Sequence, residues 1–271
     1  MKKKPTRANF LFKTKADTLK QLTELVKQSK IEKIYAFTVK EWQRSRISIL
    51  KHISSNFNKK IIVRSSAVGE DSTISSKAGS YESILNVNTS SKKEITNAIN
   101  SVISSYEIKN NNDNDNQILI QNQTLNVVIS GVIFTRTPDV GSPYFVINFD
   151  EGNLTTGVTK GSINNTVKIF RKINPKIIPE KWTRLIISVK EIEKIVGSDK
   201  LDIEFGITKN DQVVLFQVRP LTSIREKSKN IPDHDISKIV LNSKKQFKKL
   251  NKPHHILGNK TVFSDMTDWN P

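Results

Sequence analysis

Six short β-rich runs between residues 116 and 224, interrupted by one long helical pattern, most constrain the fold of this chain. Turn residues separate the runs, which read QILIQNQ, SGVIFTR, YFVINFD, TVKIFRK, LDIEFGI and QVVLFQVR. The helical pattern, PEKWTRLIISVKEIEKIV, begins with a proline, which is tolerated at a helix start because the first N–H has no partner there. This grouping predicts a sheet-rich subdomain with one long helix.

The first 115 residues have a different pattern, in which helices and strands alternate. The segment KTKADTLKQLTELVKQ places its leucines on one helical face, and IIV at 61–63 and YESILNV predict two strands. Two capping boxes mark further helix starts, Thr38 with Glu41 and Ser91 with Glu94. We therefore predict an α+β protein with two subdomains, residues 1–115 and 116–224, and a cleft between them.

Two segments fit neither subdomain. Residues 225–271 are basic and polar and end in FSDMTDWNP without a closing element. We expect a linker or the start of a truncated next domain, with a natural C-terminus as the alternative. The run NNNDNDN at 110–116 predicts a flexible loop, because an EF-hand would need a glycine at its turn and a glutamate at its end.

Composition limits the partners of the chain. It has no cysteine, which excludes disulfides and thiolate metal sites and favours a cytoplasmic protein. We find no apolar run of about 18 residues that would span a membrane and no signal peptide. The net charge of +18 suits phosphorylated small molecules or nucleic acid. The lysines are dispersed and no nucleic-acid motif occurs, so a basic nucleic-acid binder is our third hypothesis.

Two segments carry polar residues that strand packing does not explain. In IIVRSSAVGEDS a strand runs into arginine, serines and glycine, which form either a polar turn or a loop that holds an anion. In LDIEFGITKNDQVVLFQVRPLT a hairpin would bring Asp202 and Glu204 beside Gln217 and Arg219, since side chains alternate between strand faces. Such a set suits Mg²⁺ and phosphate. A solvent-facing hairpin with an ordinary ion pair is the alternative.

Four segments taken together resemble the ATP-grasp, nucleotide-binding domain of the phosphoenolpyruvate synthase and pyruvate phosphate dikinase family. They are KTKADTL, IIVRSSAVGEDSTISSKAGSYESILNV, SGVIFTRTP, and LDIEFGI with LFQVRPLT. The resemblance covers residues 12–222 and implies an ATP-grasp fold with the nucleotide cleft between two subdomains. It implies ATP and Mg²⁺ as cofactors. It also implies transfer of a phosphoryl or pyrophosphoryl group to a histidine on a separate domain, then to a small acceptor, giving AMP and phosphate.

The resemblance also implies roles for individual residues. Lys15 and Arg64 would contact phosphate, and Arg219 would stabilise the transferring phosphates, which makes these three the catalytic candidates. Glu204 and Gln217 would be the metal ligands. The loop 65–79 would close over the phosphates, and LIQNQT would form the hinge and line the adenine pocket. The further nucleotide-binding candidates in these two segments are Ser65, Ser66, Gly69, Gly79, Gln121, Asn122 and Gln123.

The chain departs from the family pattern in two respects. Thr137 stands where the family has aspartate, and SSYEIKNNNDNDNQ lacks the arginine that precedes the hinge. In addition, none of His52, His234, His254 and His255 has the glycine-rich context of the transfer histidine. We therefore expect the phosphohistidine and acceptor domains in another part of a longer chain or in a partner chain. A non-catalytic, nucleotide-binding regulatory module is our second hypothesis.

Three segments of the chain resemble one branch of the family most. They are KTKADTL, SPYFVINFDEGNLTTGVTKG and FSDMTDWNP. This branch contains the L-glutamine kinases of bacterial capsule phosphoramidate synthesis. The resemblance implies the amide of L-glutamine as acceptor, and a pyruvate-like acceptor is the alternative.

Overall fold

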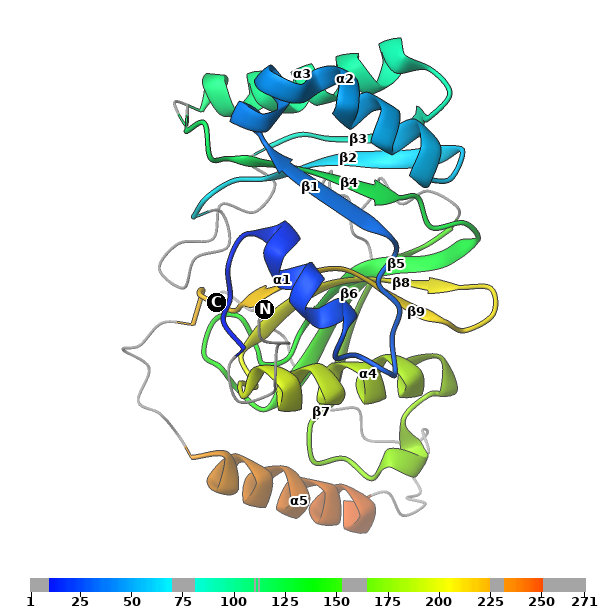
Figure 1. Cartoon of the computed structure of the whole chain (residues 1–271). Coiled ribbons are helices and arrows are strands. Elements are labelled where there is room, and N and C mark those ends of the chain that lie inside the picture. The colour runs from blue at the N-terminus through cyan, green and yellow to red at the C-terminus, as the bar shows by residue number, and fades with distance from the viewer. Residues whose placement is uncertain are drawn as a thin grey trace, which may run out of the picture. The chain divides into compact units, whose positions relative to one another are not determined.

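The computed structural model describes residues 10–69, 81–109, 111, 113–152, 165–224 and 232–250. The chain divides into two compact units, Met1–Arg225 and Glu226–Pro271. The first unit contains two antiparallel sheets, and the second contains the helix α5 (Asp233–Leu250) (Figure 1). Within the described residues, no helix is long and apolar enough to cross a membrane.

The first sheet has four strands in the order β1-β4-β2-β3. Its strands are β1 (Ile34–Thr38), β2 (Lys60–Ser66), β3 (Ser83–Asn88) and β4 (Gln117–Asn122). The helices α2 (Val39–Asn56) and α3 (Lys92–Ile108) lie together on one side of it (Figure 1). Alternate residues of the strands, such as Val63 and Ile118, join these helices in one buried apolar cluster. The opposite face of this sheet therefore carries Arg64, Ser66 and Gln121.

The helix starts in this part follow the sequence prediction, one fully and one in part. Thr38 caps α2 through its hydroxyl, which accepts from Glu41 N, and the Glu41 carboxylate accepts from Thr38 N at 2.7 Å. Ser91 caps α3 in the same way, but the Glu94 carboxylate accepts from Asn88 N instead of the cap residue. The first capping box is confirmed and the second is half formed.

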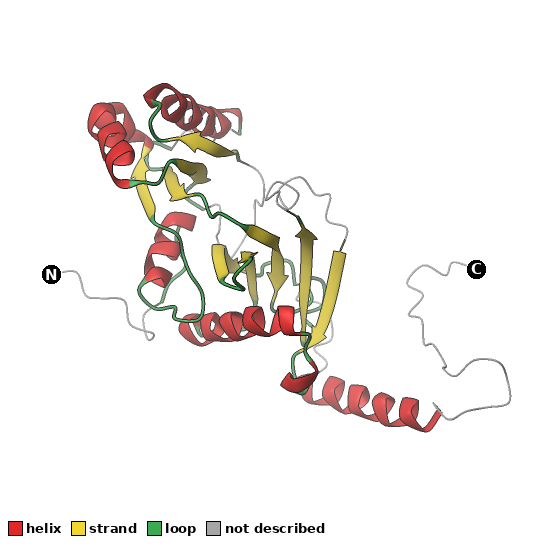
Figure 2. Cartoon of the chain, turned by 90° about the vertical axis from the view of Figure 1, so that its right-hand side faces the viewer, coloured by secondary structure: helices red, strands yellow, loops and turns green. Residues whose placement is uncertain are grey.

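The second sheet has five strands in the order β7-β6-β5-β8-β9. Its strands are β5 (Val127–Phe134), β6 (Tyr144–Glu151), β7 (Asn165–Phe170), β8 (Leu201–Thr208) and β9 (Val213–Pro220). The short η2 (Pro175–Ile177) leads into the long helix α4 (Glu180–Val196), which lies against the sheet (Figure 2). The first helix, α1 (Lys15–Thr23), adds its leucines to the same apolar cluster. The α+β class is as predicted.

The strands β5 and β6 approach unusually closely at Gly131. A Cβ at this position would overlap the carbonyl oxygen of Asn148 and lie 2.9 Å from the Cα of Phe149. Both of those atoms belong to backbone, which cannot move aside without disturbing the ladder. Gly131 is therefore required by the sheet itself.

The asparagine-rich segment differs from its sequence prediction. Asn116 is fully buried, and its side-chain oxygen accepts from Val68 N while its amide nitrogen donates to Asn111 O, both at 2.9 Å. Its backbone carbonyl accepts from Val39 N at the start of α2. The predicted flexible loop is wrong for this residue, because one asparagine side chain can satisfy a donor and an acceptor of two neighbouring loops.

Candidate functional site

The β8–β9 hairpin brings together the four polar residues that the sequence singled out. Glu204 is paired with Gln217, and Asp202 with Arg219, in the antiparallel register of the two strands. Asp202 and Glu204 alternate with Leu201, Ile203 and Phe205, which belong to the apolar core. The four polar side chains therefore share the face of the sheet that lies away from that core. The predicted hairpin is confirmed.

Arg64 connects this hairpin to the other sheet. Its Nη2 donates to Glu204 Oε2 at 2.8 Å, and its Nη1 donates to the carbonyl oxygen of Phe216 at 2.7 Å. Burial tends to raise the pKa of Glu204, but the charge and hydrogen bond of Arg64 and the charges of Lys15 and Arg219 hold it below its ordinary value. Glu204 is therefore a carboxylate at neutral pH, surrounded by three cations.

Arg219 is bonded to Asp202 on the same face. Its Nη2 and Nε donate to a single oxygen, Asp202 Oδ2, at 2.6 and 2.9 Å. Both side chains are about nine-tenths buried. Asp202 Oδ1 has no hydrogen-bond partner although it is buried. Burial raises the pKa of Asp202, and the charge and hydrogen bond of Arg219 work against that rise. The structure thus leaves one buried carboxylate oxygen beside Glu204 able to accept a ligand.

Lys15 enters the site from the first turn of α1. Thr14 caps this helix, and Lys15 is only 5% exposed. Its charge lowers the pKa of Glu204, which places the ammonium group within electrostatic range of that carboxylate. Ala16 N donates to the Ser66 hydroxyl at 2.9 Å, so the start of α1 is attached to the end of β2. Lys15 and Arg64 thereby reach Glu204 from neighbouring elements.

The predicted phosphate loop is only partly described. Ser65 and Ser66 belong to β2 and are buried, and Ser66 N donates to the hydroxyl of Tyr106 at 2.9 Å. Gly69 has a φ of +77°, a conformation that favours glycine. Gly79 and the rest of the loop from residue 70 to 80 lie outside the described residues.

The three hinge candidates differ in what their side chains do. Asn122 Oδ1 accepts from Asn58 N, and the amide of Gln123 exchanges two hydrogen bonds with Asn86. These two side chains hold turns of the backbone. Gln121 is 1% exposed, and neither its Nε2 nor its Oε1 has a hydrogen-bond partner. Among the three, only Gln121 carries a free donor and a free acceptor.

The sequence analysis missed the position of Phe216. The register of β9 shifts after Glu204, so that Leu215 points into the apolar core while Gln217 lies on the polar face. A Cβ on Gly206 would lie 2.8 Å from the Phe216 ring, which puts that ring over Gly206, two residues from Glu204 on β8. No simple alternation of the strand sequence reveals this bulge.

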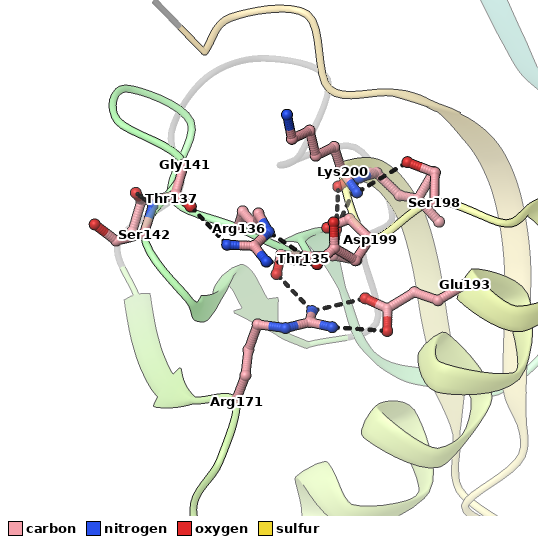
Figure 3. Close-up of polar contacts among 11 residues, drawn as sticks. Thr135, Arg136, Thr137, Gly141, Ser142, Arg171, Glu193, Ser198, Asp199 and Lys200 are labelled. Carbon is pink, nitrogen blue, oxygen red and sulfur yellow. Dashed lines mark hydrogen bonds and ion pairs between the residues drawn. The ribbon is translucent and has the colours of Figure 1, made fainter. Parts of the chain in front are cut away.

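The SGVIFTRTP motif belongs to a separate polar network (Figure 3). Arg136 donates twice to Asp199 Oδ2, at 2.6 and 3.0 Å. Arg171 forms a two-bond pair with Glu193, at 2.7 and 2.9 Å, and also donates to the carbonyl oxygen of Thr135. The Thr137 hydroxyl accepts from Ser142 N in the β5–β6 turn. None of these bonds involves Glu204 or Arg219, so the motif ties turns together.

The described histidines do not join the site. His52 lies on α2, and the centroid of its ring is 4.4 Å from that of the Tyr35 ring. His234 is exposed and lies beside Asp235 on α5, which belongs to the second unit. His254 and His255 lie outside the described residues.

The site residues fit a hard divalent cation. Asp202 Oδ1 is buried without a partner, and Glu204 and Gln217 face each other across the hairpin. Carboxylate and amide oxygens are the donors that Mg²⁺ takes in proteins, with phosphate oxygens completing its shell. The described residues contain no cluster of three or more histidine, cysteine or acidic side chains, so the site would depend on a phosphate ligand to hold the ion.

The two antiparallel sheets and their helices form an α+β protein of the ATP-grasp type. The family model described as "Pyruvate phosphate dikinase, AMP/ATP-binding domain" matches residues 10–184, and the chain belongs to this family. The match ends before β8 and β9, so the strands that carry Glu204, Gln217 and Arg219 lie beyond it. The chain thus contains the ATP-binding domain of the family, as its sequence predicted. No curated protein matches the sequence.

Solved structures with a similar arrangement are ligases of low sequence identity. VanG D-Ala:D-Ser ligase from Enterococcus faecalis has a TM-score of 0.45 and 14% identity over 77% of this chain and 53% of that chain. D-Alanine-D-alanine ligase from Helicobacter pylori has a TM-score of 0.44 and 15% identity over 77% of this chain and 51% of its own. The chain spans about half the length of these ligases. With scores this low, we draw nothing about function from them.

Proposed function

We propose that the chain binds Mg-ATP between its two sheets and serves a dikinase-type phosphotransferase. In this proposal a phosphoryl or pyrophosphoryl group of ATP passes to a histidine on a separate domain and then to a small acceptor, giving AMP and phosphate. The L-glutamine amide is the proposed acceptor, and a pyruvate-like molecule is the alternative. This part of the proposal rests on the resemblance of the sequence to the family.

One observation carries the proposal: two carboxylates and three cations meet where the two sheets join. Arg64, Lys15 and Arg219 surround Glu204, and Asp202 has a buried oxygen without a partner. A cluster of this composition would hold phosphate oxygens through the cations and a divalent ion through the carboxylates. Phosphoryl transfer needs positioning and charge neutralisation more than a nucleophile from the binding domain. Neither of the described histidines, His52 and His234, lies at this cluster, which is consistent with the proposal.

Gln121 supports adenine as the base. Its buried amide offers one donor and one acceptor without partners, and a glutamine amide can pair with both the N6 amino group and N7 of adenine. Guanine has an acceptor in place of the N6 donor. We therefore expect ATP to bind more tightly than GTP, and the variant Gln121→Leu to bind both nucleotides weakly and alike.

The test is a calorimetric titration of the chain with Mg-ATP, beside the double variant Glu204→Ala, Gln217→Ala. We expect the parent to bind and the double variant to lose the part of the affinity that depends on Mg²⁺. The matched control is Arg136→Ala, which removes an ion-paired arginine from the same subdomain and should bind like the parent. An absence of binding by the parent at millimolar Mg-ATP would contradict the proposal.

A further measurement distinguishes the phosphotransferase from the second hypothesis, a non-catalytic regulatory module. Once Mg-ATP binding is established, the nucleotide is analysed after incubation with a complete enzyme that contains this chain. Formation of AMP that Arg219→Met abolishes supports the phosphotransferase. Unchanged ATP with tight binding supports the regulatory module.

A further inference from the structure

Glu204 lies in the field of several positive charges. Arg219 is paired with Asp202, with two hydrogen bonds to Oδ2. Arg64 and Lys15 both act on Glu204. Because Arg64 and Lys15 are buried, their charges are screened less than they would be at the surface.

Arg64 is held so that it competes directly for the proposed metal ligand. Its Nη2 occupies Glu204 Oε2 at 2.8 Å, and its Nη1 is anchored on the Phe216 carbonyl oxygen at 2.7 Å. The side chain is about nine-tenths buried. A divalent cation that approaches Glu204 alone would meet this guanidinium and the nearby ammonium of Lys15. An anion would be attracted by the same two groups.

We propose that Arg64 prevents free divalent cations from binding at the site and allows them to bind only together with the phosphates of a nucleotide. A phosphate oxygen takes over the Nη2 donor of Arg64, while Nη1 stays on the Phe216 carbonyl oxygen. The rigid fork of the guanidinium suits this exchange, because its donors point in fixed directions. The exchange releases Glu204 Oε2 for the metal. Phosphate and metal therefore bind with strong positive coupling. This inference rests on the proposed nucleotide site.

The test measures binding of Mn²⁺, used as a paramagnetic probe, without nucleotide. We expect the parent to bind Mn²⁺ alone at least tenfold more weakly than the variant Arg64→Met, which has a similar apolar stem without the charge. With ATP present, the order reverses, because the parent keeps its phosphate contact. By linkage, ATP raises Mn²⁺ affinity by the same factor as Mn²⁺ raises ATP affinity. This factor should fall at least tenfold in Arg64→Met.

Two further variants keep the test decisive. Arg136→Met removes a paired arginine outside the site, from the subdomain that carries Glu204, and should leave Mn²⁺ binding unchanged. If Arg64→Met does not fold, as its thermal transition would reveal, Lys15→Met carries the same comparison, and a gain in nucleotide-free Mn²⁺ binding is again expected. Equal Mn²⁺ affinity of the parent and a folded variant overturns the inference. That outcome is distinct from failure of the proposed function, which is the loss of Mg-ATP binding by the parent.

Discussion

Two groups of arginine–carboxylate pairs contact the five-stranded sheet, and they differ in whether a buried carboxylate oxygen is left without a hydrogen-bond partner. The turn pairs, Arg171–Glu193 and Arg136–Asp199, each join one arginine to one carboxylate through two hydrogen bonds (Figure 3). The site pairs, Arg64–Glu204 and Arg219–Asp202, share their surroundings with a third cation and leave a buried carboxylate oxygen without a partner.

We expect this comparison to separate arginines that hold the fold from arginines that bind a ligand. A matched pair satisfies all of its partners within the chain and gains nothing from a further ion. A cluster with a buried carboxylate oxygen that lacks a partner is stabilised by a ligand that supplies one, as a divalent cation bound with an anion would. Sequence alone does not distinguish the two groups, because both consist of arginine and acid.

The largest expected effect comes from Arg219→Met, which breaks a site pair. It leaves Asp202 buried without its counter-ion, and removing one partner of a buried pair costs about 3–5 kcal/mol of unfolding free energy. Mg-ATP binding is lost as well. Denaturant unfolding and calorimetry measure the two effects. The double variant Asp202→Asn, Arg219→Met should regain part of the stability and none of the binding. Full binding by the single variant would contradict the role of Arg219.

Arg171→Met breaks the better buried of the turn pairs. Glu193 then keeps its charge in a largely buried position, and we expect a loss of about 2–4 kcal/mol in unfolding free energy. The affinity for Mg-ATP, measured calorimetrically below the melting temperature, should stay within twofold of the parent. A tenfold loss of affinity in a folded protein would mean that the turn pairs belong to the site.

The pH dependence of stability sharpens the comparison at Glu204. Its folded-state pKa lies below the ordinary value of 4.5, so its ion pair stabilises the protein fully above that value and loses this contribution as the pH falls through the folded-state pKa. The stability difference between the parent and Glu204→Gln should therefore be constant from neutral pH down to about 5 and shrink below it. Chemical unfolding at each pH tests this. A difference that grows on acidification would contradict the pairing.

Arg136→Met gives the smallest expected effect. Its partner Asp199 is 40% exposed at the side chain, and exposed ion pairs contribute about 0–1 kcal/mol. We expect a melting temperature within a few degrees of the parent and unchanged nucleotide binding. A loss as large as that of Arg171→Met would show that the second turn pair supports the β5–β6 turn more than its exposure suggests.

Much of the fold follows from the sequence, because local patterns determine it. The helix starts at Thr38 and Ser91 and the β8–β9 hairpin were predicted from capping residues, turn residues and alternation. The grouping of strands was wrong in one place: the run QILIQNQ, assigned to the sheet-rich subdomain, forms β4 and pairs with β1 and β2 in the first sheet. The prediction of a flexible loop failed at Asn116. A composition rich in asparagine indicates a solvated segment as a whole, but it does not reveal the one buried position where a side-chain amide is bonded to two loop segments. The α+β class and the ATP-binding family are confirmed.

The site was predicted less completely. Resemblance selected Arg64 and Glu204, but their mutual ion pair joins residues 140 positions apart and could not be read from either segment. The bulge that separates Leu215 from Gln217 is also invisible to simple alternation. The roles proposed for Lys15, Arg64, Glu204, Gln217 and Arg219 stay predictions until the measurements above are made.

The close approach at Gly131 has a consequence for recognising relatives of this protein. The glycine is demanded by backbone atoms of Asn148 and Phe149 on the neighbouring strand β6. A descendant that had lost ATP binding altogether would still need it to build the sheet. The glycine of the S-G-V segment therefore reports on the architecture of the sheet. We expect the residues equivalent to Arg64, Glu204, Gln217 and Arg219, and not this glycine, to separate active enzymes from inactive ones.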